Sequence, residues 1–153
     1  MKKESVSEYA ILPEMELILQ IHKGNIEYEN IKNLKCSICD NKDYRPNFNF
    51  IIDIRDATVA MSREELIEYG EFVIDKLNPQ CPIKLAVLSK TPEHVASTMV
   101  FQLNLKSKFL RYEAFSTVSG ALKWLGISNN RFNSLTLEAI ISNMKGEPII
   151  DLG

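Results

Sequence analysis

Apolar residues recur along this chain with two different periods, and each change of period marks a change of secondary structure. Residues 9–12 and 15–22 have strand character, with Pro13 and Glu14 between them as a tight connection. After Gly24 the spacing becomes helical and predicts a helix over roughly residues 26–39. The core-facing stripe of that helix is expected to consist of Ile26, Ile31, Leu34 and Ile38.

The middle of the chain alternates strands and helices. A near-continuous apolar run from Phe48 to Ile54 is typical of a central strand covered on both faces. Ser62 and Glu65 form a capping box that opens a helix, and Asn78-Pro79 ends it. The pattern then predicts a strand over 83–88, a helix opened by Thr91-Pro92-Glu93, a strand over 109–115, and a short helix over 116–125 closed by Gly126.

The last two of these helices have an expected inner face. In the helix opened by Thr91, the buried side is predicted to be Val95, Ala96, Met99, Val100 and Leu103. In the short helix, the inward stripe is predicted to be Val118, Ala121, Leu122 and Leu125. A rotation of about 100° per residue puts Trp124 to one side of that stripe, so something is expected to cover its indole. Packing against the C-terminal segment is favoured over a ligand platform.

Strand, strand, and then helix and strand in alternation predict an α/β sandwich, because parallel neighbours need helical crossovers. We expect a mixed, mostly parallel five-stranded sheet flanked by about four helices, formed by residues 1–127, with an antiparallel first strand. Residues 128–153 form an extension: a polar linker, a helix over about 134–145 and an extended tail. The extension is too apolar to remain free in water, so it should dock on its own domain or on a second subunit.

Composition narrows the function class. The chain has 153 residues, 45% hydrophobic and 25% charged, and its 18 basic and 20 acidic residues are mixed along the sequence. The net charge of −2 argues against nucleic-acid binding. No apolar run approaches the ~20 residues that cross a bilayer, and the N-terminus lacks the apolar core of a secretory signal. With an odd number of cysteines, three, a disulfide-stapled secreted domain is not expected either. We expect a cytoplasmic protein without membrane insertion.

Three stretches in this order, FNFIIDIRDATVAMSREEL, KLAVLS followed by a capped helix, and FSTVSGALKWLGI, resemble the SpoIIAA-like branch of the STAS superfamily. The resemblance covers about residues 8–127. STAS domains include anti-sigma-factor antagonists and the cytoplasmic parts of sulphate transporters, and this branch is related in fold to the CRAL-TRIO, or SEC14-like, lipid-binding domains. The resemblance therefore implies a fold and a binding role, not a reaction.

Anti-sigma-factor antagonists typically carry a phosphorylatable serine where a helix follows a strand that ends in an aspartate. The resemblance puts Ser62 at that position, as a candidate phosphorylation site. The family's usual run there is Asp-Ser-Ser-Gly, whereas this chain has Met61-Ser62-Arg63-Glu64. Glu64 and Glu65 would repel a phosphate, and a capping box explains Ser62 completely, so a plain N-cap is the favoured interpretation.

Polar residues also follow two of the predicted strands, at the carboxyl edge where open α/β sheets usually place ligands. The candidate ligand or partner edge consists of Asp53, Arg55, Asp56, Thr58, Ser62, Ser89 and Lys90. The favoured alternative is structural, with Asp53 accepting backbone N–H bonds in a loop and Arg55 pairing with Asp56 or a helix carboxylate. No nucleophile, metal motif or glycine-rich phosphate loop accompanies these residues, so we expect neither enzymatic activity nor a cofactor.

Cys36 and Cys39 form the one C-x-x-C motif. They fall near the predicted C-terminal end of a helix, where the dipole raises a thiol pKa, and a metal site would need partners from separate elements. Buried structural cysteines are therefore favoured, with no metal. His22 and His94 are expected to be surface or hydrogen-bonded histidines.

Two functional hypotheses follow. The first is a non-enzymatic regulatory module that acts through protein contacts, as a possible homodimer. Its candidate interface is Trp124, Phe101, Leu105, Leu137 and Ile141. The second is a carrier or sensor of a small apolar or lipid-like ligand held between sheet and helices, as the SEC14-like relatives suggest. An enzyme that uses the acidic edge is the weakest hypothesis.

Overall fold

The computed structural model describes residues 5–127 and 132–147. Most of the predicted linker and the extended tail after residue 147 lie outside the described residues. The elements are β1 (Val6–Leu12), η1 (Pro13–Met15), β2 (Leu17–Ile26), α1 (Tyr28–Asp40), β3 (Asn49–Val59), α2 (Arg63–Leu77), β4 (Ile83–Leu88), α3 (Pro92–Asn104), β5 (Leu110–Phe115), α4 (Val118–Leu125) and α5 (Ser134–Met144).

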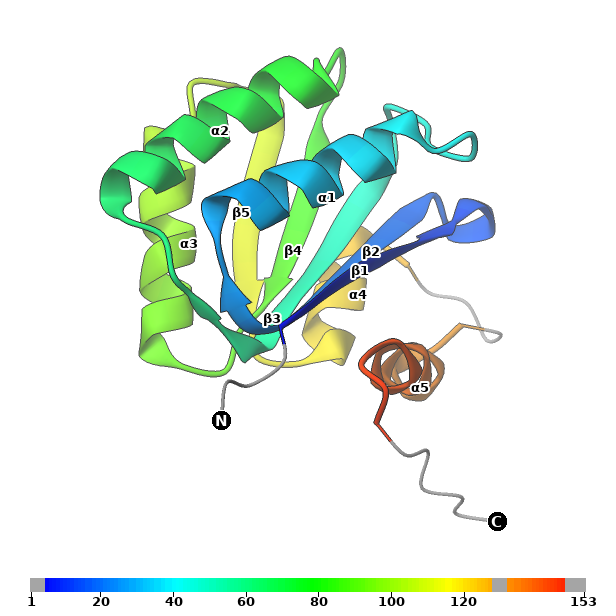
Figure 1. The fold of residues 1–153 in the computed structure, drawn as a ribbon. Coiled ribbons are helices and arrows are strands. Elements are labelled where there is room, and N and C mark those ends of the chain that lie inside the picture. The colour runs from blue at the N-terminus through cyan, green and yellow to red at the C-terminus, as the bar shows by residue number, and fades with distance from the viewer. Residues whose placement is uncertain (1–4, 128–131, 148–153) are drawn as a thin grey trace.

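The five strands form one sheet in the order β1-β2-β3-β4-β5 (Figure 1). The β1–β2 pair is antiparallel and the other three pairs are parallel. Because each parallel strand lies next to the preceding one in a single direction, right-handed crossovers place α1, α2 and α3 on the same face of the sheet. This confirms the predicted α/β architecture with a mixed, mostly parallel five-stranded sheet.

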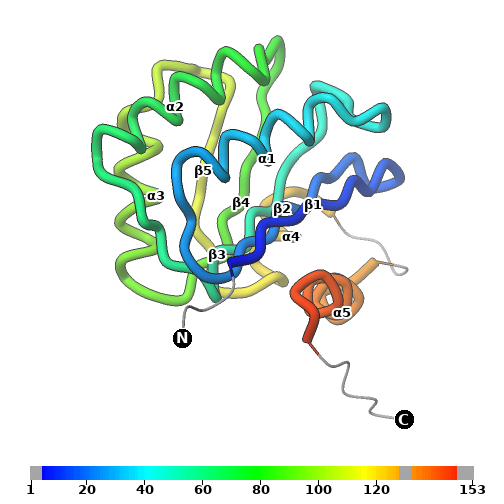
Figure 2. Tube along the Cα trace, in the orientation of Figure 1, coloured from blue at the N-terminus to red at the C-terminus, as the bar shows by residue number. Residues whose placement is uncertain are grey.

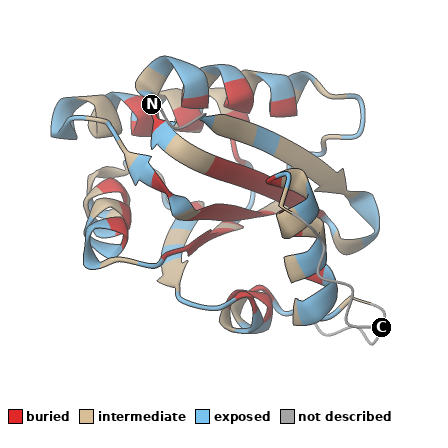
Figure 3. Cartoon of the chain, turned by 60° about the horizontal axis from the view of Figure 1, so that its bottom comes forward, coloured by how far each residue is buried: buried red, intermediate tan, exposed pale blue. Residues whose placement is uncertain are grey.

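Each face of the sheet has its own apolar core. On β3, Phe50 and Ile52 pack toward the α1–α3 layer, whereas Ile51 packs toward α4 and α5. Since side chains alternate between the faces of a strand and both faces are covered, the central strands are buried almost continuously (Figure 3).

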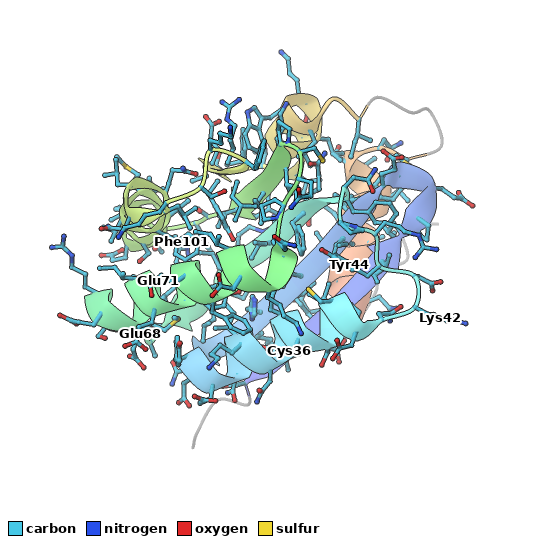
Figure 4. The ribbon with its side chains drawn as sticks, turned by 90° about the horizontal axis from the view of Figure 1, so that it is seen from above. Cys36, Lys42, Tyr44, Glu68, Glu71 and Phe101 are labelled. Carbon is cyan, nitrogen blue, oxygen red and sulfur yellow. The ribbon has the colours of Figure 1, made fainter. Side chains whose placement is uncertain are left out.

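In the first layer, α1 and α2 lie side by side above the sheet, and Phe101 of α3 points toward α2 (Figure 4). The Phe101 ring centroid is 5.7 Å from that of Tyr69 on α2 and 4.7 Å from that of Tyr112 on β5. Gly70 permits this close approach of the two helices, because a Cβ at this position would lie 3.2 Å from Leu105.

The second layer consists of α4 and α5, on the opposite face from α1 (Figure 2). The four residues of the predicted inward stripe of α4 are all buried, which confirms that stripe. Leu137 and Ile141 of α5 are buried in the same core. Trp124 is half-buried; its ring centroid lies 5.3 Å from that of Phe115, and the Lys84 amine is 5.2 Å from the indole.

The predicted end of the central strand was wrong. β3 continues through Asp53 to Val59 because β2 also continues, and the two stay paired up to Ile26 and Val59 beyond a register shift between Ile21 and Lys23. The polar stretch therefore belongs to a strand and not to a loop. Ile26 is likewise the last residue of a strand, whereas the sequence pattern placed it in the first helix.

The helix caps follow their sequence signals. The Ser62 hydroxyl accepts a hydrogen bond from the Glu65 N–H, and the Glu65 carboxylate accepts one from the Ser62 N–H, so the predicted capping box is confirmed. Thr91 caps α3 in the same way with His94. Gly126, at φ 76°, ends α4 in the left-handed conformation that favours glycine.

The predicted inner face of α3 was wrong. Its buried residues are His94, Thr98 and Phe101. Of the residues expected inside, Val95 is 40% exposed, Met99 58% and Leu103 80%. The apolar pattern of this helix faces outward because hydrogen bonds satisfy the polar groups beneath it: the His94 Nε2–H donates to the Ala57 carbonyl over 2.8 Å, and the Thr98 hydroxyl donates to the His94 carbonyl over 2.9 Å.

This inversion also affects the candidate interface residues. Phe101, Leu137 and Ile141 are buried within the chain itself, so in this structure they are not accessible to a partner. Leu105 is half-buried and packs beside Gly70. Phe101 and Leu105 are interface candidates because they lie off the predicted buried stripe of α3, and that reasoning fails because the predicted stripe is the exposed one. Leu137 and Ile141 are candidates as apolar residues of the C-terminal extension, and both are buried where α5 docks on the sheet.

Candidate functional site

The polar end of β3 is organised around one buried carboxylate, Asp53. Its Oδ1 accepts from the Arg55 N–H over 2.9 Å and from Arg55 Nε over 3.0 Å, and its Oδ2 accepts from Arg55 NH2 over 3.0 Å. The Lys145 amine also lies 3.0 Å from Oδ2. Asp53 is fully buried, and the Lys145 side chain is only 4% exposed. Two cations therefore neutralise one buried anion.

The C-terminal helix completes this cluster. Arg55 forms a two-point contact with Glu138 of α5, at 2.7 Å and 3.2 Å. Lys145, which follows the last turn of α5, donates to Asp56 over 2.8 Å. We call Asp53, Arg55, Asp56, Glu138 and Lys145 the edge cluster. It ties α5 to the carboxyl end of β3, with the apolar contacts of α5 beneath it.

The charges of the edge cluster reinforce one another. Burial alone would raise the pKa of Asp53, but the hydrogen bonds and charge of Arg55, together with the charge of Lys145, hold that pKa below its usual value. The hydrogen bond from Lys145 lowers the pKa of Asp56. Burial acts to lower the pKa of Lys145, and the two aspartates more than reverse this effect. All these groups are ionised at neutral pH, so neither aspartate is poised to exchange protons as a general acid.

A polar crevice lies between α5 and the carboxyl ends of β3 and β4. Its volume is about 460 Å³, and its walls include Arg55, Asp56, Ser89 and Lys90. The structure therefore brings five predicted edge residues together, since Asp53 lies under the same ion pairs. Thr58 lines a different hollow, beside Thr91 and His94 at the start of α3. Ser62 opens α2, in the layer opposite α5. The predicted single surface is thus divided.

Sequence reasoning missed Glu138 and Lys145. It identified the apolar stripe of the C-terminal helix but gave no role to the charges on it. Glu138, Ile141 and Lys145 are spaced i, i+3 and i+7, which places both charges beside a buried residue. An acid and a base on the inner side of an amphipathic helix predict ionic partners on the surface it covers.

A second polar cluster lies on the other face of the sheet, and sequence reasoning also missed it. The amine of Lys35 donates to Gln20 Oε1 over 2.7 Å, Gln20 Nε2 lies 2.8 Å from His22 Nε2, and His22 Nδ1 lies 2.9 Å from the Ser7 hydroxyl. Because the lysine can only donate to the amide oxygen, the amide NH2 faces His22, whose Nε2 must accept. His22 therefore carries its proton on Nδ1 and donates it to Ser7.

This buried chain, Lys35–Gln20–His22–Ser7, contains no carboxylate. Burial, reinforced by the charge of Lys35, lowers the pKa of His22 to about 4. Burial also lowers the pKa of Lys35 to about 7. The Lys35 amine lies 4.2 Å from the centre of the Phe50 ring, which partly offsets the missing anion. His22 is thus a neutral hydrogen-bonded histidine, one of the two predicted situations.

An apolar cavity adjoins this row of hydrogen-bonded side chains, at Gln20. Its volume is about 80 Å³, and it lies between the sheet, α1, α2 and α3. Gln20 contributes one wall, and the others are mainly aliphatic and aromatic, including Ile52, Ile54, Leu66 and Phe101. An engineered cavity of ~150 Å³ in another protein admits benzene, so this space can hold only a few carbon atoms unless the helices separate.

The remaining candidates have structural surroundings. Cys36 and Cys39 lie on α1 and are half-buried, not buried as predicted, and burial raises the pKa of Cys39. His94 is hydrogen-bonded on both ring nitrogens, since Nδ1 accepts from the Lys90 N–H over 3.1 Å. Within residues 5–127 and 132–147, no group of three metal-binding side chains converges. In the same ranges, no helix is both long and apolar enough to span a bilayer.

Comparison with known proteins supports the fold assignment. No family model matches the sequence, and no protein of curated function matches it either. Among solved structures, the chain is similar to an uncharacterised protein of the DUF3478 family from Shewanella loihica PV-4, which has a SpoIIAA-like fold. The TM-score is 0.57 at 14% sequence identity, over 82% of this chain and 98% of that one. The chain therefore has a SpoIIAA-like fold, as its resemblance to that branch of the STAS superfamily predicted.

Proposed function

We propose that this chain is a non-enzymatic binding module that acts through protein contacts made by the outer face of α3. The observation that carries the proposal is the outward apolar stripe Val95, Met99 and Leu103, which we call the α3 stripe. The three residues are four apart, so they lie along one side of the helix. Burying each of these side chains would contribute on the order of 1–2 kcal/mol to the free energy of binding. Only a partner surface that covers the stripe gains this contribution.

Two further features support a binding role over catalysis. The charged groups of the edge cluster are already paired with one another, and Asp53 and Arg55 are each engaged by more than one partner. The fold is SpoIIAA-like, and the resemblance to STAS domains implies a binding role and not a reaction. The α3 stripe, by contrast, is apolar and exposed.

The proposal is tested with one substitution and a closely matched control. Leu103→Glu places a charge in the α3 stripe, and Leu135→Glu places the same charge on α5, where the leucine is 79% exposed compared with 80% for Leu103. Each variant is immobilised beside the wild type and exposed to extract from the native cell. We expect wild type and Leu135→Glu to retain the same protein and Leu103→Glu to lose at least about 90% of it, a loss of ~1.4 kcal/mol or more. Equal retention by all three would contradict the proposal.

A second candidate function is binding of a small apolar molecule in the cavity beneath α2 and α3. Its almost wholly apolar lining supports it. A long lipid chain does not fit about 80 Å³, so we propose a ligand of a few carbon atoms.

The cavity is tested by filling it. Val87→Phe adds a phenyl ring to the wall, and Leu135→Phe makes a comparable change at an exposed site. With xenon, a smaller apolar probe than benzene, at about ten times its dissociation constant, wild type and Leu135→Phe should gain ~1.4 kcal/mol in the free energy of unfolding, and Val87→Phe should gain nothing. Thermal unfolding measures the gain, and native mass spectrometry of the gently purified wild type would detect a retained ligand. No gain in the wild type together with no retained mass would exclude this candidate.

A further inference from the structure

The outer face of α3 is self-complementary when two copies of the helix are placed antiparallel. Met99 lies midway along the α3 stripe, with Val95 four residues before it and Leu103 four residues after it. A two-fold axis through Met99 would therefore set each Val95 against the partner's Leu103. The larger side chain meets the smaller one at both ends, and Met99, a flexible apolar side chain, fills the centre.

The charges at the two ends of α3 follow the same symmetry. Glu93, in the first turn, is exposed, and Lys106, just past the C-cap, is also exposed. Glu93 lies six residues before Met99 and Lys106 lies seven residues after it. This difference of one residue corresponds to only ~1.5 Å along a helix axis. In an antiparallel pair, each acid lies at the same level along the helix axis as the partner's base. A parallel pair would bring like charges together at both ends, which costs stability.

The free edge of the sheet, at β5 near α3, is partly blocked. β5 is the last strand of the sheet, and the outward N–H of Tyr112 at its centre donates to Gln102 Oε1 of α3 over 2.5 Å. A second chain adding to β5 would have to displace this side chain. Self-association at this end of the molecule is thus directed to the helix and away from the strand.

We propose that the α3 stripe binds a second copy of this chain, in a two-fold symmetric dimer with the two α3 helices antiparallel. This inference rests on the proposed function and specifies its partner. A pair of 13-residue helices buries less than the ~800 Å² per partner of a standard interface. The dimer is therefore weak, with a dissociation constant in the micromolar range or above, and responds to concentration.

Sedimentation equilibrium of the full chain over about 5–500 µM tests the dimer, because weak interfaces of this size have dissociation constants in that range. Wild type and Leu135→Glu should pass from monomer to dimer, with Leu103→Glu at least tenfold weaker. Glu93→Lys and Lys106→Glu should each weaken the dimer several-fold, because each sets like charges together at both ends. The double variant should restore it. Mixing the two single variants should produce a heterodimer that neither forms alone.

Restoration by the double variant and by the mixture is specific to antiparallel self-pairing. A strictly monomeric wild type over the whole range overturns the dimer, as does a double variant no stronger than the single ones. In either case, the capture experiment from cell extract decides whether the proposed function stands. If Leu103→Glu alone still loses the captured protein, the proposed function stands with a different partner. Binding of wild type to anionic vesicles in place of self-association, lost in Leu103→Glu, would overturn both proposals in favour of a lipid surface.

Discussion

Replacing Asp53 with alanine is expected to lower the free energy of unfolding by about 3–5 kcal/mol, one of the largest effects of any single substitution in this chain. The carboxylate is fully buried between Arg55 and Lys145, and its loss leaves the Lys145 amine, almost without solvent contact, facing only Asp56. Removing one partner of a buried ion pair exposes the full cost of burying the other. Urea unfolding followed by circular dichroism gives the difference directly.

A matched control separates burial from charge. Asp40 forms an ion pair with Lys76 at 3.8 Å, and its side chain is 74% exposed. Asp40→Ala removes the same chemical group from a solvated pair and should change stability by less than about 1 kcal/mol. If Asp53→Ala were as mild as Asp40→Ala, the edge cluster would not be what fixes α5 to the sheet.

The response to acid provides a second measurement on the same variant. Because the pKa of Asp53 in the folded chain is below its unfolded value of ~3.9, its contribution is complete above that value and is lost as the pH falls through the folded pKa. In wild type, stability should therefore drop steeply below about pH 4. In Asp53→Ala the drop should be shallower, because the contribution of Asp53 is gone and that of Asp56 remains.

The fold could be predicted from sequence more fully than the site could. Strand-length apolar runs, capping residues and a closing glycine are local signals, and each of them correctly located an element. The polar end of β3 was assigned to a loop because its strand character depends on pairing with β2, which no local pattern contains. Likewise Arg55 finds Glu138 across 83 residues of chain, a pairing set by where α5 docks.

The α3 error has a different physical cause. An apolar stripe predicts the buried face of a helix when the polar residues on the opposite face can be satisfied only by water. In α3 the polar residues His94 and Thr98 are inside because backbone carbonyls accept their hydrogen bonds, and the apolar residues are left outside. The proposed function and the proposed dimer both start from that exception.

Replacing Lys35 with methionine is expected to stabilise the protein, by about 1–3 kcal/mol at pH 7. Lowering the pKa of a fully buried lysine from 10.5 to about 7 corresponds to a penalty on the order of 4 kcal/mol at neutral pH. Methionine has a similar length and removes this penalty. The gain is partial because Gln20 Oε1 loses its donor, a cost of ~1–3 kcal/mol for a buried acceptor.

The dependence on pH distinguishes this cause from better packing. Above the unfolded pKa of ~10.4, Lys35 is neutral in both the folded and the unfolded chain. Between that pH and about pH 7, Lys35 is protonated in the unfolded chain and mainly neutral in the folded chain. Wild-type stability should therefore rise between pH 7 and about pH 9, whereas Lys35→Met should be nearly flat, so the advantage of the variant shrinks as the pH rises. Lys32→Met, one turn earlier on α1 at a half-buried site, should keep the wild-type slope. An advantage of Lys35→Met that stayed constant across this range would mean that the pKa of Lys35 is the same in the folded and unfolded chains, and that the gain comes from packing and not from removal of a buried charge.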